Sequence, residues 1–364
     1  MNDKMHIPIV DLTREFKLYQ SELVDIFLNV GLSGQYVFGE EVCLFEQQFA
    51  KFCGTDYAIS CANASDGLEI GLRALSVGPG DEVITAANSF ISSGGSIAAC
   101  GATPVFADVT DDLLIDPVSV KHLISDKTKA IMPVHLTGRP APMNEIMAIA
   151  KKHKLHVIED AAQAIGAEYH GQKVGSLGDI AVFSLHPLKN LHVYGDGGVI
   201  TTKSDVLNSF MLKFRNHGLV DRDHTEFWGR NSRLDTLQAA IARFKLKKIE
   251  TINSKFKSIA AKYNEELSQV VITPSDKPHE CSVYHNYVIL SDRRDDLMSY
   301  LKNHGIDVKV RYPVPLTLQN VEPKKGVAPN AESLANRMLS LPIFPTMTDV
   351  EINYVITKVK EFYA

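Results

Sequence analysis

The stretch from His156 to Thr202 constrains the fold of this 364-residue chain more than any other. It contains three apolar runs, HVIED, IAVFS and VITT, each with the length of a buried strand. The first run ends in Asp160, and Lys189 follows shortly after the second. We therefore expect the carboxylate and the amine beyond the carboxyl ends of two strands, at the edge of an open α/β sheet where ligands bind.

An aspartate and a lysine in this arrangement suit the chemistry of pyridoxal phosphate (PLP). A lysine amine condenses with the cofactor aldehyde, and an acidic side chain keeps the pyridine nitrogen protonated so that the ring draws electrons. Each residue alone has an ordinary explanation, because lysines near strand ends are mostly solvated and aspartates after strands often cap helices. The prediction therefore depends on motifs elsewhere in the chain.

Composition narrows the class of protein. A chain of this length, with 45% hydrophobic and 22% charged residues, is expected to form a large and a smaller domain, which we place at residues 1–250 and 251–364. The net charge of −5 argues against a nucleic-acid partner. The five cysteines form no C-x-x-C pair, and no signal peptide or membrane-spanning run is apparent. We therefore expect a cytoplasmic protein with no membrane partner.

Apolar runs that alternate with helical segments predict an α/β fold, with a mostly parallel central sheet and helices on both faces. Besides the three runs above, strands are expected at 82–85, 103–109 and 130–135. From about residue 250 the pattern changes to α+β. Helices are expected there at 251–269 and 348–362, and strands at 287–290 and 307–312. This change of pattern indicates that the smaller domain begins near residue 250.

The segment YAISCANASDGL predicts a strand, a turn and a helix that starts near Ser65. Backbone N–H groups and the dipole at such a helix start bind anions. Ala64 and Ser65 are therefore candidates for binding the phosphate of the cofactor. An ordinary helix cap is the alternative at this position.

Residues 159–198 resemble the DegT/DnrJ/EryC1/StrS family of sugar aminotransferases, and the similarity runs from SGQYVFGEEV through SLPIFPTMTDVE. The resemblance implies a fold-type I PLP-dependent transferase, with pyridoxamine phosphate as the amino form of the cofactor. NASDGL is similar to the phosphate loop of this family. Ala64 replaces the usual glycine there, which works only if this position does not need a positive φ.

The resemblance also implies roles for single residues. Lys189 and Asp160 are the catalytic pair. Phe90 stacks on the cofactor ring, although an aromatic at a helix start is otherwise simply core. Gln163 contacts the phenolic oxygen of the cofactor, and Ser184 binds its phosphate.

The segment that begins at Gly229 resembles the family's G-x-N-x-R motif. In the family, the residue equivalent to Asn231 reaches the phosphate in the neighbouring subunit. A homodimer whose active sites are shared across the interface follows from this resemblance. Candidates for contact with the substrate are His186, Trp228, Arg233, Arg311 and Tyr312; core packing is the alternative for Trp228.

Where the family usually has H-Y-P-x-P-x-H, this chain has RYPVPLT from Arg311 to Thr317. A guanidinium group binds a carboxylate or a phosphate with two hydrogen bonds, so Arg311 is suited to an anionic substrate. A solvated charge at the edge of the cleft is the alternative. No metal-binding spacing is present in the sequence.

The leading hypothesis is an aminotransferase that moves an amino group from L-glutamate to a keto-sugar. The preferred acceptor is a keto-deoxysugar linked to dTDP, UDP or GDP, used for surface polysaccharide or other amino-sugar biosynthesis. Because the Arg311 guanidinium is suited to a carboxylate, a keto or aldehyde sugar acid without a nucleotide is the alternative acceptor. A PLP-dependent sugar dehydratase carries histidine at the lysine position, so Lys189 argues against it. No added domain supports a sensor that binds PLP without catalysis.

Overall fold

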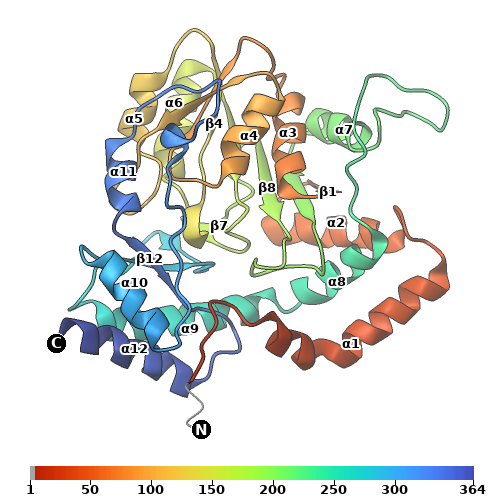
Figure 1. The fold of residues 1–364 in the computed structure, drawn as a ribbon. Coiled ribbons are helices and arrows are strands. Elements are labelled where there is room, and N and C mark those ends of the chain that lie inside the picture. The colour runs from red at the N-terminus through yellow and green to blue at the C-terminus, as the bar shows by residue number, and fades with distance from the viewer. Residues whose placement is uncertain (1–4) are drawn as a thin grey trace.

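The computed structural model describes residues 5–364, which contain a seven-stranded central sheet of order β1-β9-β8-β5-β4-β2-β3 (Figure 1). These strands are β1 (Tyr57–Cys61), β2 (Glu82–Ala86), β3 (Thr103–Ala107), β4 (Thr128–Met132), β5 (His156–Asp160), β8 (Ile180–Ser184) and β9 (Gly198–Thr202). Neighbours from β8 to β3 run parallel, whereas β9 is antiparallel to both β1 and β8. The predicted, mostly parallel sheet is confirmed.

Helices cover both faces of this sheet (Figure 1). One face carries α3 (Ala64–Ala74), α4 (Ile91–Ala99) and α7 (Asp205–Phe214), and the other carries α2 (Glu40–Cys53), α5 (Pro117–Leu123) and α6 (Met143–His153). Successive strand residues point to opposite faces. In β5, Val157 packs into the cluster that includes α6, and Ile158 packs into the cluster that includes α3. Both faces are buried, which explains why the strands read as continuous apolar runs.

The part after the sheet is α+β, as the sequence predicts. It contains α8 (Thr236–Leu246), α9 (Ile249–Leu267), α10 (Arg294–Asn303), α11 (Pro329–Ala335) and α12 (Asp349–Tyr363), with β11 (Tyr287–Leu290) paired to β12 (Met338–Leu341). Short elements complete the chain: β6 (Glu168–Tyr169), β7 (Gln172–Lys173), β10 (Glu280–Cys281), η1 (Leu136–Gly138) and η2 (Leu316–Leu318). The domain division at residue 250 stays a prediction.

The strand expected at 307–312 is wrong. Only Lys309 forms a bridge there, to Ser340, and the residues after it leave the sheet. Arg311 and Tyr312 instead line a cavity beside the central sheet. The alternation of apolar and polar residues in DVKVRY therefore reflects a cavity wall with one buried side, not a strand.

Helix α1 (Leu12–Ser33) lies along the edge of the molecule beside α8 (Figure 1). Its first turn is joined to α12, because Arg14 donates to both carboxylate oxygens of Glu351, each at 2.9 Å. Glu15 and two apolar residues face inward. The outer side of α1 exposes Leu18, Val24, Phe27, Leu28 and Leu32. The helix therefore presents an apolar surface that the single chain leaves uncovered.

Candidate active site

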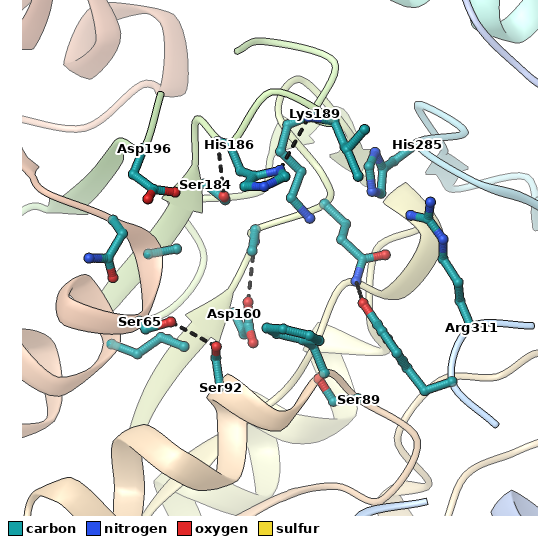
Figure 2. A pocket seen from close by; sticks show the side chains of 18 of the residues that line it. Ser65, Ser89, Ser92, Asp160, Ser184, His186, Lys189, Asp196, His285 and Arg311 are labelled. Atoms are coloured by element: carbon teal, nitrogen blue, oxygen red, sulfur yellow. Dashed lines mark hydrogen bonds between the residues drawn. The ribbon is translucent and has the colours of Figure 1, made fainter. Parts of the chain in front are cut away.

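A cavity of about 570 Å³ lies where the carboxyl ends of β5 and β8 meet the N-terminus of α3 (Figure 2). Five predicted residues that line it come from α3, α4 and the first half of the sheet: Ala64, Ser65, Phe90, Asp160 and Gln163. Five more come from later in the chain: Ser184, His186, Lys189, Arg311 and Tyr312. The edge of the sheet predicted from the two strand ends is thus the place where these side chains meet.

Asp160 ends β5 with its side chain buried in the floor of this cavity. Its Oδ2 accepts a hydrogen bond from Ser93 Oγ at 2.7 Å, and its Oδ1 accepts one from the N–H of Ala162 at 3.3 Å. Burial raises the pKa of the carboxyl, and these two donors and Lys189 offset part of the rise. The carboxylate has further acceptor capacity toward a cation or an N–H group in the cavity.

Lys189 lies in the turn after β8, and its amine points into the cavity (Figure 2). Burial lowers the pKa of Lys189 to about 8, with Asp160 acting against the decrease and Arg311 adding to it. A lysine with a pKa near that of the medium is partly neutral, and the neutral amine is the nucleophile that attacks an aldehyde. The position is thus chemically suited to a covalent link with a carbonyl group.

The first residues of α3 form one end of the cavity. Ala64 and Ser65 begin the helix behind the cap Asn63, and Ser65 Oγ lies 2.7 Å from Ser92 Oγ. The φ angle of Ala64 is not positive, so alanine can replace the usual glycine at this position. Ser184 at the end of β8 adds a second hydroxyl to the lining. Backbone N–H groups and hydroxyls at a helix N-terminus are suited to a phosphate group.

Close packing brings α3 to this position. A Cβ atom added to Gly67 would lie 2.7 Å from Val182 Cγ1, and one added to Gly71 would lie 2.8 Å from Ile158 Cδ1. The two glycines are one helical turn apart, so they let one side of α3 rest directly on β5 and β8. The helix start therefore reaches the same edge as Asp160.

Aromatic and amide groups form the side walls. Phe90 caps α4, is 48% exposed and lies 5.6 Å from the ring of Tyr312, so the plain-core alternative for Phe90 is wrong. Gln163 lies in the turn after β5 and lines the same cavity as Asp160. Its Oε1 accepts from the N–H of Thr137 at 2.9 Å, and its Nε2 lies 3.4 Å from Tyr312 Oη. These walls leave a slot suited to a flat ring.

Three predicted residues lie outside the cavity of their own chain. Trp228 is 90% exposed, which makes the core-packing alternative for it wrong. Asn231 is exposed and pairs with Asn216, and the Arg233 guanidinium stacks over Phe38. The roles expected for these three residues stay predictions.

Several further residues, not expected from the sequence, lie in or beside the cavity: Asn63, Ser89, Ser92, Ser93, Asp196, His285 and Lys309. Ser93 is one turn after Phe90, and that spacing was the available signal. His285 is buried, and its Nδ1 has no hydrogen-bond partner among residues 5–364. It follows no strand and carries no motif, so nothing in the sequence marks it.

Comparisons with known proteins decide the family. The model of the DegT/DnrJ/EryC1/StrS aminotransferase family matches residues 19–360. The chain belongs to this family. The sugar aminotransferase resemblance and the fold-type I architecture are therefore confirmed.

Individual members of the DegT/DnrJ/EryC1/StrS family match over nearly the whole chain. A "pleiotropic regulatory protein" of Geobacillus stearothermophilus is 42% identical over 99% of both chains. The dTDP-3-amino-3,4,6-trideoxy-alpha-D-glucose transaminase of Streptomyces venezuelae is 38% identical over 98% of this chain and 96% of its own. The crystal structure of S. venezuelae DesV with a ketimine intermediate superposes with a TM-score of 0.95, at 37% identity and 98% coverage of both chains.

The DegT/DnrJ/EryC1/StrS family is PLP-dependent, and this chain is a PLP-dependent aminotransferase. Its cavity has the set of groups that the cofactor requires. The α3 N-terminus suits the phosphate, the buried Asp160 carboxylate suits the pyridine N–H, and the Lys189 amine suits the aldehyde. Among residues 5–364, no cluster of three or more His, Cys, Asp or Glu side chains forms a metal site. None of the helices in that range is long and apolar enough to cross a membrane.

Proposed function

We propose that this protein transfers an amino group from L-glutamate to a keto-sugar linked to a nucleotide. The arrangement of Asp160, Lys189 and the α3 N-terminus around one cavity is the observation that carries the proposal. The nucleotide-sugar transaminase of S. venezuelae described above supports a nucleotide-linked acceptor. In the overall reaction, glutamate becomes 2-oxoglutarate and the sugar carbonyl becomes an amine.

The cofactor supplies an electron sink when it is bound, and the protein supplies position, charge and a proton carrier. Asp160 would place a negative charge at the ring nitrogen of the bound cofactor, and Ser93 fixes that carboxylate with a 2.7 Å hydrogen bond. Phe90 and Gln163, which line the same cavity, would hold the plane of the ring. Lys189 would take a proton from the substrate carbon and return one to it, because its lowered pKa of about 8 suits both an acid and a base.

The mouth of the cavity selects the substrate in this proposal. Arg311 and Lys309 line it, and neither has an ion-pair partner among residues 5–364. Guanidinium and ammonium groups in such a position bind the carboxylates of glutamate or the phosphates of a nucleotide. The same two cations favour, as a second candidate, a sugar acid without a nucleotide.

We further propose that the protein is a homodimer whose active sites are shared. The apolar outer surface of α1 supports an interface, because large exposed apolar patches mark contact sites. Asn231 is exposed and lies outside its own cavity, as expected for a residue that serves the neighbouring subunit. The cytoplasmic location stays a prediction.

Two half-reactions test the proposed function. The PLP-loaded protein should release one 2-oxoglutarate per subunit from L-glutamate. The pyridoxamine phosphate form should then add an amine to a keto-sugar carrying dTDP, UDP or GDP, as detected by mass spectrometry. Amination of a free keto sugar acid, with no reaction of any nucleotide-linked sugar, would favour the second candidate. Release of no 2-oxoglutarate, with no sugar aminated, would contradict both.

A further inference from the structure

A buried polar cluster is hydrogen-bonded to the backbone of Lys189 and lies outside the lining of the active-site cavity. It consists of Glu15 on α1, Lys245 on α8 and His192 in the connection between β8 and β9. The Lys245 side chain is fully buried, and the Glu15 and His192 side chains are 11% and 7% exposed. None of these groups faces the cavity of the active site.

The hydrogen bonds of the cluster lead to the backbone of Lys189. His192 Nδ1 lies 2.9 Å from the Lys189 carbonyl oxygen. A carbonyl only accepts, so Nδ1 carries the hydrogen and donates, whatever the state of the other ring nitrogen. On the far side of the ring, Nε2 lies 2.7 Å from Lys245 Nζ and 3.1 Å from Glu15 Oε2. Lys245 Nζ is in turn 3.0 Å from Glu15 Oε1.

The charges of the cluster depend on one another. Burial lowers the pKa of Lys245, and Glu15 opposes the decrease. Burial also acts to raise the pKa of Glu15, but contacts with His192 and Lys245 outweigh it, so the net change is a decrease. A buried ion pair is poor evidence for stability, since desolvation offsets the attraction. Its best-supported use is to specify one arrangement of the groups it joins.

The main chain at Lys189 has space to move if this arrangement is lost. A second cavity, of about 30 Å³, is lined by Leu188, Lys189, Glu15 and His285, among others. Protein interiors are otherwise tightly packed, so a void beside the turn makes its position depend on directed hydrogen bonds. The Lys189 N–H donates to the His186 carbonyl oxygen at 2.8 Å, and the bond from His192 is the one side-chain hydrogen bond to the Lys189 carbonyl among residues 5–364.

We propose that Glu15, Lys245 and His192 are positioning residues that tie helix α1 to the backbone of Lys189 and so hold its amine at the cofactor aldehyde. The inference rests on the proposed role of Lys189 as the residue linked to the cofactor. It also gives α1 two functions on opposite sides. Its outer surface is the proposed dimer interface, and its inner side contributes Glu15. The contacts from Glu15 through Lys245 and His192 therefore connect α1 to the Lys189 backbone.

The test compares two ligands that occupy one site. PLP needs the Lys189 amine for covalent capture, whereas pyridoxamine phosphate binds without it. The double variant Glu15→Gln/Lys245→Met removes both charges together and leaves no unpaired buried ion. A matched control, Glu41→Gln/Arg243→Met, removes the Arg243–Glu41 ion pair that joins the same helix α8 to α2, at 2.7 Å. His192→Ala removes the bond to Lys189, and His192→Asn places an amide N–H near the position of Nδ1.

We expect Glu15→Gln/Lys245→Met and His192→Ala to capture PLP about tenfold more slowly than the wild type, because a displaced nucleophile reacts slowly. Pyridoxamine phosphate should bind all variants with a dissociation constant within about twofold of the wild-type value, since its contacts are elsewhere. His192→Asn should capture PLP faster than His192→Ala. The control variant should match the wild type in both measurements.

The proposal is overturned if both test variants capture PLP at the wild-type rate, or if the control slows as much as they do. It is equally overturned if capture and pyridoxamine phosphate binding weaken together, since that result indicates a general loosening of the fold. A wild-type protein that forms no covalent link through Lys189 would instead refute the proposed function. The two failures are therefore distinguishable.

Discussion

Asp160 and Arg311 act on the Lys189 amine in opposite directions. The carboxylate favours the charged form of the amine, and the guanidinium disfavours it. Burial is the larger effect and sets the pKa of Lys189 at about 8. At the scale of single residues, burial, Asp160 and Arg311 together set the reactivity of the Lys189 amine. The effects of Asp160 and Arg311 can be tested by substitution.

Arg311→Met should make Lys189 less reactive near neutral pH. Loss of the positive charge lets the pKa of Lys189 rise from about 8, so the neutral fraction falls about tenfold for each unit of increase. The rate of covalent PLP capture by the cofactor-free variant, measured against pH, should show its midpoint at a higher pH than the wild type. Arg337→Met, at an exposed ion pair with Asp292, is the control and should leave the midpoint unchanged. A midpoint that stays or moves downward in Arg311→Met would contradict this.

At the scale of elements, α3 connects the packing of the sheet to the binding of the phosphate. Gly67 and Gly71 set the distance between this helix and the strands, and the helix start supplies Ala64 and Ser65 to the cavity. The sequence identifies the helix and its turn from the pattern NASDGL. It does not identify the contact between Gly67 and Val182, because that contact joins residues far apart in the chain.

Gly67→Ala should destabilise the protein and weaken binding at the start of α3. The added Cβ would lie 2.7 Å from Val182 Cγ1, and such overpacking costs about 1–3 kcal/mol in the free energy of unfolding. Urea unfolding and titration with pyridoxamine phosphate measure the two effects. Gly95→Ala on α4, where an added Cβ meets nothing within 4 Å, is the matched control. It should be neutral or slightly stabilising, since alanine favours helix. Equal stability of the two variants would refute the packing argument.

At the scale of the whole molecule, the features that follow from local sequence patterns could be predicted. The strand ends at Asp160 and Ser184 predict that Asp160 and Lys189 lie at one edge of the sheet, and this placement is confirmed. Arg311 and Tyr312 were assigned to a strand, because alternation alone cannot distinguish a strand from an irregular cavity wall. His285 lines the cavity, and Glu15, His192 and Lys245 form the cluster bonded to the Lys189 backbone. The sequence does not indicate either placement, because both result from contacts between segments that are distant in the chain.

Phe27→Asp tests the interface proposed for the complete assembly. Phe27 is 61% exposed on the outer side of α1, so a charge there should not unfold the chain but should prevent an apolar surface from pairing. Sedimentation should show dimers for the wild type and monomers for the variant. Lys302→Asp, at an exposed position on α10 and therefore outside the apolar surface of α1, is the control and should remain dimeric. A monomeric wild type, or a variant that dimerises as the wild type does, would rule out this interface.

The identity of the lysine that binds the cofactor is the most direct test of the whole account. Borohydride reduction of the PLP-loaded protein fixes the cofactor on its lysine, and peptide mass spectrometry then locates the label. We expect the label on Lys189, and no label in Lys189→Ala. A label on any other lysine of the wild type, or a label that persists in Lys189→Ala, would contradict it.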